Sequence, residues 1–183
     1  MMANMHNVTR LCLGLGLLGL TACDGNTVLM EAVIAGDQAR IEQRLTAGEP
    51  VNAQNNYGWS ALAHAARKGD VATVRLLLAK GASLQLRDQN GWTPLMRAAE
   101  KGRSDVVSLL LANGADINST TPDGWSALQW AVARAHVATV ELLIARGADV
   151  QRKTMDGRSP LAIAISEGHD EVIDVLRRAG AQL

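Results

Sequence analysis

The chain has 183 residues, 48% of them hydrophobic and 20% charged, so it suits one folded domain or two small ones and excludes a disordered tail. Its 18 Lys and Arg residues balance 18 Asp and Glu residues, and this neutrality argues against a dedicated nucleic-acid-binding protein. Only two cysteines occur, Cys12 and Cys23, which excludes a disulfide scaffold and a cysteine-rich zinc site.

Residues 1–22 have the features of a secretory signal peptide. Arg10 is the only charged side chain before residue 24, and it precedes an apolar run over residues 11–20. A helix of that length reaches roughly 15 Å, about half the thickness of a bilayer core. The run therefore predicts an export signal and not a membrane-spanning anchor.

The end of this segment, Leu20-Thr21-Ala22-Cys23, resembles the lipobox of bacterial lipoproteins. The resemblance implies cleavage between Ala22 and Cys23 and a covalent lipid on Cys23, and no other cofactor is expected. Asp24 resembles the residue that retains such lipoproteins in the inner membrane. We therefore expect a protein anchored to a membrane and facing the periplasm, with the inner membrane favoured over the outer. The alternative is an ordinary signal peptide in which Cys23 is incidental.

Residues 23–183 form one predicted domain, built from a unit that recurs every 33 residues without insertion or deletion. Its copies cover about residues 24–54, 55–87, 88–120, 121–153 and 154–183. Hydroxyl residues mark the same position in each copy: Thr27, Ser60, Thr93, Ser126 and Ser159. Each is the predicted N-cap of a short Ala-rich helix, and Pro94 and Pro160 suit the first helical position.

Glycines predict where these first helices end, namely at Gly36, Gly69, Gly102 and Gly168. Ala135 takes that place in the fourth copy, so a slightly strained turn is expected there. A second helix then follows, such as 71–80, and after it an extended stretch and a turn. The predicted unit is helix, turn, helix and hairpin loop.

The segment Gly91-Trp92-Thr93-Pro94-Leu95-Met96-Arg97-Ala98-Ala99 resembles the ankyrin motif T-P-L-H-x-A. The resemblance implies an all-α ankyrin-repeat solenoid that binds other proteins. The motif's histidine is absent from all five copies, and its usual link from helix to neighbouring loop is expected to be lost. Polar residues replace apolar ones in the second helices of the first and last copies, as capping repeats require, and we expect a monomer.

Catalytic chemistry is not predicted. The 161 residues after cleavage leave no room for a catalytic domain beside five repeats. The chain has no nucleophile elbow, HExxH motif or P-loop. His136 and His169 share one repeat position at the start of a second helix, which favours a structural role over metal binding.

The resemblance to ankyrin repeats implies a concave groove beside the hairpin loops, and this groove is the predicted partner site. Trp59, Trp92 and Trp125 share one repeat position and are expected to form a ladder with spacings of about 8–10 Å, and Trp is enriched at binding hot spots. The alternative is that these rings only hold the hairpins in register, and Trp130 is assigned mainly to packing. A basic rim completes the predicted groove: Arg67, Lys68, Arg97, Lys101 and Arg134. The alternative is that these charged side chains are simply solvated at the helix ends and bind no partner.

The leading hypothesis is a lipid-anchored module that binds a protein partner, with toxin-immunity and stress-accessory roles both open. The rivals are an envelope sensor for a small molecule or peptidoglycan fragment and, less favoured, an unrecognised hydrolase. Basic residues among aromatics can also bind nucleic acid, but a periplasmic address argues against that partner.

Overall fold

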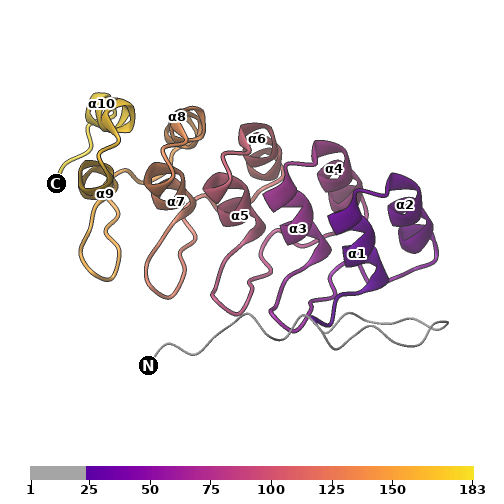
Figure 1. The fold of residues 1–183 in the computed structure, drawn as a ribbon. Coiled ribbons are helices and arrows are strands. Elements are labelled where there is room, and N and C mark those ends of the chain that lie inside the picture. The colour runs from indigo at the N-terminus through magenta and orange to yellow at the C-terminus, as the bar shows by residue number, and fades with distance from the viewer. Residues whose placement is uncertain (1–23) are drawn as a thin grey trace.

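The computed structural model describes residues 24–183, which form an array of helix pairs joined by hairpin loops (Figure 1). The first helices of the pairs lie in one row and the second helices in another. The first helices are α1 (Val28–Ala35), α3 (Ala61–Lys68), α5 (Pro94–Glu100), α7 (Ala127–Ala133) and α9 (Pro160–Glu167). The second helices are α2 (Gln38–Thr46), α4 (Val71–Ala79), α6 (Ser104–Ala112), α8 (Val137–Ala145) and α10 (Asp170–Arg178). Within the described residues no strand forms, so the predicted all-helical solenoid is confirmed.

Each first helix begins at its predicted hydroxyl cap. The Ser60 hydroxyl, for example, accepts a hydrogen bond from the backbone N–H of Ala63 at 3.2 Å, which satisfies one of the donors that a helix start leaves unpaired. The same bond occurs in the other four copies. Among the second helices, Asp37 and Asp70 supply side-chain caps to α2 and α4.

The turn after α7 carries the expected strain. Ala135 has φ 55°, and it is the one non-glycine residue of 24–183 with a positive φ. Its counterparts Gly36, Gly69, Gly102 and Gly168 adopt φ values between 65° and 87°. Because a Cβ atom crowds the backbone in this region, alanine is less favourable there than glycine.

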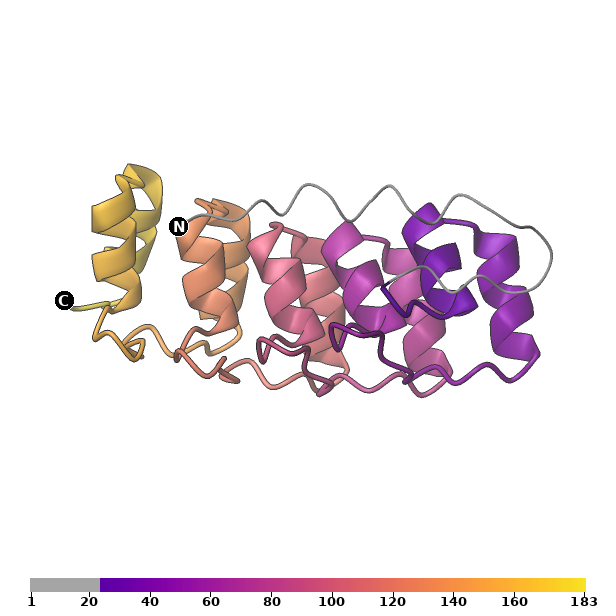
Figure 2. The same cartoon turned by 60° about the horizontal axis from the view of Figure 1, so that its bottom comes forward.

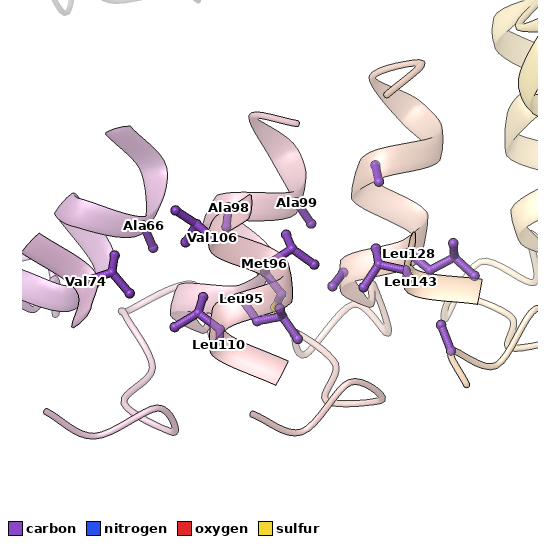
Figure 3. Close-up of a cluster of buried hydrophobic side chains, with 14 of the residues drawn as sticks. Ala66, Val74, Leu95, Met96, Ala98, Ala99, Val106, Leu110, Leu128 and Leu143 are labelled. Atoms are coloured by element: carbon purple, nitrogen blue, oxygen red, sulfur yellow. The ribbon is translucent and has the colours of Figure 1, made fainter. Parts of the chain in front are cut away.

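A continuous apolar core runs between the two rows of helices (Figure 3). Small residues of the first helices, such as Ala98 and Ala99, let neighbouring repeats approach closely, and both are fully buried. Larger side chains fill the space towards the second helices, among them Leu95, Val106 and Leu110. Burial of a Leu or Val side chain contributes about 1.5–3 kcal/mol, so this core is the main source of stability.

The hairpin loops project from the row of first helices and follow one another along one side of the array (Figures 1 and 2). Backbone hydrogen bonds join successive loops: Asn56 N–H donates to the Asp24 carbonyl, and Gln89 N–H donates to the Tyr57 carbonyl, both at 3.0 Å. The loops pack closely, since a Cβ atom on Gly58 would lie 2.8 Å from the Asp88 Cα. Their relative positions are therefore held by the backbone itself.

No helix in residues 24–183 is long and apolar enough to cross a membrane.

Candidate binding surface on the hairpin side

The hairpin turns fix the tryptophans of the predicted ladder through one side chain in each loop. The Asp88 carboxylate accepts hydrogen bonds from the N–H groups of Asn90 and Trp92, at 2.9 and 3.0 Å. Asn55 does the same for Tyr57 and Trp59. These side chains mimic a backbone turn and hold the following aromatic residue at the start of the first helix.

The gaps in the predicted ladder are filled by other side chains. Trp130 of α7 lies between Trp92 and Trp125, with ring centroids 4.1 and 4.4 Å away. The Arg97 guanidinium lies 4.1 Å from the ring centroids of both Trp59 and Trp92. The four tryptophans thus belong to one stack of rings and cations. Such contacts stabilise the array, which favours a structural role for Trp92 and Trp125.

Arg97 is fixed from a second direction. Its guanidinium forms an ion pair with Asp88, whose side chain is only 3% exposed. The carboxylate therefore has three donors: the guanidinium and the two turn N–H groups. Arg97 is consequently an internal link between α5 and its hairpin, and its charge is already paired within the array.

Three other residues of the predicted basic rim are also engaged. Lys101 and Arg134 pair with the buried carboxylate of Glu100, at 3.0 and 3.8 Å. The Lys68 ammonium donates to the carbonyls of Val33 and Ile34, at 3.5 and 3.2 Å. These bonds satisfy the carboxylate and the C-terminal carbonyls of α1.

The Lys68 contact is one of a series in which each repeat caps the first helix of the repeat before it. Arg103 Nε donates to the Arg67 carbonyl, and His136 and His169 approach the carbonyls of Glu100 and Ala133. The two histidines therefore have the structural role that their shared repeat position predicted. No group of three or more His, Cys, Asp or Glu side chains in residues 24–183 is placed to hold a metal ion.

Arg67 differs from the rest of the rim. Its side chain is exposed, its guanidinium lies 5.9 Å from the Trp59 ring, and no carboxylate of residues 24–183 forms an ion pair with it. An exposed cation beside an aromatic ring is available to a partner. Arg67 is thus the rim residue best placed to bind one.

Two adjoining pockets open beside Arg67. The first has a volume of about 540 Å³ and is lined by Ile34, His64, Arg67, Lys68, Lys101 and Arg103. The second, of about 390 Å³, shares four of these residues. It is completed by Asp24, Asn26, Asn55, Tyr57, Trp59, Arg97 and Glu100. The pockets lie across the first three repeats, whereas Trp125 of the predicted ladder lies in the fourth.

His64 lies where the pockets meet. Its ring centroid is 4.8 Å from that of Trp59, and its Nε2 is buried without a hydrogen-bond partner. Burial, and then the positive charges of Arg67 and Arg97, lower the pKa of His64 from 6.5 to about 4. His64 is therefore neutral near pH 7, mainly because it is buried and secondarily because two guanidinium groups lie near it.

Sequence reasoning missed several residues of this surface. Tyr57 is 54% exposed and Ile34 is 47% exposed, both large apolar side chains beside the pockets. Arg103 also lines the first pocket and is not among the predicted rim residues. What these residues share is the exposure of a large side chain at the end of a first helix or at a hairpin tip. The repeat register alone does not reveal that exposure.

The repeat geometry agrees with a comparison against protein families, in which the model for ankyrin repeats in three copies matches residues 29–121 and 113–183. The chain belongs to the ankyrin-repeat family. Ankyrin repeats typically act as protein-binding modules without catalytic activity. A search of curated proteins finds no significant match.

The chain departs from the ankyrin motif where the histidine is replaced, and in the fourth repeat the structure supplies a substitute. Gln129 is fully buried; its side chain accepts from the Ser126 N–H at 2.7 Å and donates to the Arg152 carbonyl at 2.9 Å. The predicted loss of a helix-to-loop link therefore does not hold for this repeat.

Proposed function

We propose that this ankyrin array is a binding module whose partner protein docks over the two pockets of the first three repeats. The observation that carries the proposal is the adjoining pair of pockets, of about 540 and 390 Å³, with the exposed Tyr57 and the uncommitted Arg67 at their edges. Protein interfaces are enriched in Tyr, Trp and Arg, and all three residue types meet here.

The experiment compares capture of partners by two double variants. Tyr57→Ala with Arg67→Ala removes two exposed side chains at the pockets, and truncation of a hot-spot residue costs about 2 kcal/mol or more. Arg75→Ala with Met155→Ala is the matched control, because Arg75 is exposed on α4 and Met155 is 80% exposed at another hairpin. The first variant should lose at least 30-fold in affinity for the captured partner. Equal loss in both variants, or in neither, would place the partner elsewhere.

We further propose that the module is a lipoprotein on the periplasmic side of the inner membrane. The lipobox-like residues that end at Cys23 support this, although they lie outside the described residues. The Asp24 carbonyl accepts a hydrogen bond from Asn56 N–H in the hairpin before α3, so the folded array begins one residue after the proposed lipid. Its pockets would then face a partner close to the membrane, where a toxin-immunity or a stress-accessory role is feasible.

Lipidation has a direct test. Cys23→Ala should abolish incorporation of labelled fatty acid and leave an unprocessed precursor, and fractionation should place the wild-type chain with the inner membrane. Labelling that persists in the variant would rule out Cys23 as the lipid attachment site.

A sensor for a small molecule or peptidoglycan fragment is a second candidate. The first pocket, at about 540 Å³, lies within the range of about 300–1,000 Å³ that ligand sites occupy. Calorimetric titration with a disaccharide–peptide fragment should then show binding that Arg67→Ala removes. Absence of heat at millimolar fragment would leave the protein partner as the proposed ligand.

A further inference from the structure

The first pocket has an unusual balance of charge for a protein of zero net charge. Four of its six lining residues are cations and none is acidic: Arg67, Lys68, Lys101 and Arg103. They come from two segments of the chain: Arg67 and Lys68 end α3, and Lys101 and Arg103 lie in the turn between α5 and α6.

The internal partners of these cations leave positive charge unbalanced. Lys101 shares the Glu100 carboxylate with Arg134. Within residues 24–183, the side chains of Lys68 and Arg103 donate to backbone carbonyls, which carry no net charge. Arg67 pairs with no carboxylate of the described chain. A carboxylate that entered the pocket would therefore meet donors without first displacing an acidic neighbour.

His64 shows that this charge is felt inside the site. Burial is the main reason that the pKa of His64 is low; the positive charges of Arg67 and Arg97 lower it further, and Asp24 opposes them. The pocket thus combines a positive potential with a half-buried wall, which strengthens attraction to an anion compared with an exposed surface.

We propose that the first pocket binds the carboxylate of an acidic segment of the partner protein, with Arg67 as its principal donor. This rests on the proposed function, and it names the chemistry of the segment that docks there. The planar guanidinium of Arg67 can donate two parallel hydrogen bonds to one carboxylate. The adjoining pocket, with Trp59, Tyr57 and Ile34, receives the less polar neighbours of that acidic residue.

An anionic membrane surface is a poorer fit for the same charges. The cations line a recess and not a raised face, whereas a bilayer presents a flat surface. Two carboxylates, those of Asp24 and Glu100, line the adjoining pocket, and they would repel anionic lipid headgroups at close approach. A flexible peptide can place one carboxylate in the first pocket and avoid both.

The test uses the full-length chain and two fluorescent peptides, hexaglutamate and hexaglutamine, in an anisotropy titration at low salt. Hexaglutamate should bind at least tenfold more tightly. Arg67→Glu should weaken its binding at least tenfold, and Arg67→Ala should give an intermediate loss. Arg75→Glu makes the same change of net charge on α4 and should alter the affinity by less than twofold.

Three results would overturn the proposal: equal affinity for the two peptides, equal loss in the Arg67→Glu and Arg75→Glu variants, or displacement of hexaglutamate by an equimolar amount of inorganic phosphate. Binding of phosphatidylglycerol vesicles that depends on Arg67, with no binding of hexaglutamate, would assign the pocket to the membrane instead. If partner capture still depends on Tyr57 but hexaglutamate does not bind, the carboxylate site is refuted and the proposed function stands. If capture is indifferent to Tyr57 and Arg67, the proposed function itself fails.

Discussion

Arg97→Met tests whether the stack of rings and cations stabilises the array. Methionine keeps an apolar chain between Trp59 and Trp92 but removes the guanidinium, which lies 4.1 Å from both ring centroids. It also leaves the Asp88 carboxylate without its ion-pair partner, and that side chain is only 3% exposed. Because the loss of one partner of a buried pair costs about 3–5 kcal/mol, we expect unfolding to become easier by about 3 kcal/mol.

A double-mutant cycle locates the source of this cost. Asp88→Asn removes the charge but keeps an acceptor oxygen for the N–H groups of Asn90 and Trp92. Added to Arg97→Met, it should recover about 1–2 kcal/mol, because no unpaired charge remains buried. Urea denaturation followed by circular dichroism gives the four free energies, and Arg75→Met on α4 is the control, with an expected change below about 0.5 kcal/mol.

Two outcomes would refute this reasoning. A cost below about 0.5 kcal/mol for Arg97→Met would show that the stack contributes little to stability. A double variant no more stable than Arg97→Met alone would show that the buried carboxylate is not the cause.

Three further perturbations have defined outcomes. Ala135→Gly should raise stability by about 0.5–1 kcal/mol in thermal unfolding, because it relieves a φ of 55°; a loss would contradict the strain. Gln129→Ala should lower it by about 2 kcal/mol in urea, because a buried N–H and a carbonyl lose their partner; a neutral result would mean that water replaces the link. The pKa of His64 is about 4 when folded and 6.5 when unfolded, so the unfolded chain takes up a proton that the folded chain does not as pH falls through that window. The folded state should therefore lose at most about 3 kcal/mol of stability at low pH. Urea midpoints at pH 7 and pH 4.5 measure this loss, which should disappear in His64→Leu. If the variant keeps the pH dependence of the wild type, His64 is not its cause.

Local features of the fold follow from the repeat pattern. The hydroxyl caps and the left-handed residues that end the first helices depend on interactions within a few residues, so the repeat pattern predicts them, including the strained Ala135. The contacts between repeats do not follow in this way. Trp130 lies on a helix and Trp92 in a hairpin, and only the packing of one repeat on the next brings their rings to 4.1 Å.

The same reason explains the position of the candidate site. Five basic residues at the ends of first helices predicted a positive rim, but the sequence does not show which of these cations are paired with a carboxylate. The pairing depends on Asp88 and Glu100, which the fold buries beside Arg97 and Lys101. Once those pairs are formed, the uncommitted charge lies at Arg67, towards the first repeats.

Site-specific photocrosslinking tests the central claim that a partner protein docks over these pockets. A photoreactive phenylalanine analogue would replace Tyr57 at the pockets, Arg75 on α4 or Met155 at the last hairpin, in cells that make the full-length chain. The account predicts one dominant protein adduct from position 57, reduced at least tenfold by Arg67→Glu and absent from positions 75 and 155. An adduct of equal yield from position 75, or one from position 57 that is indifferent to Arg67→Glu, would contradict it.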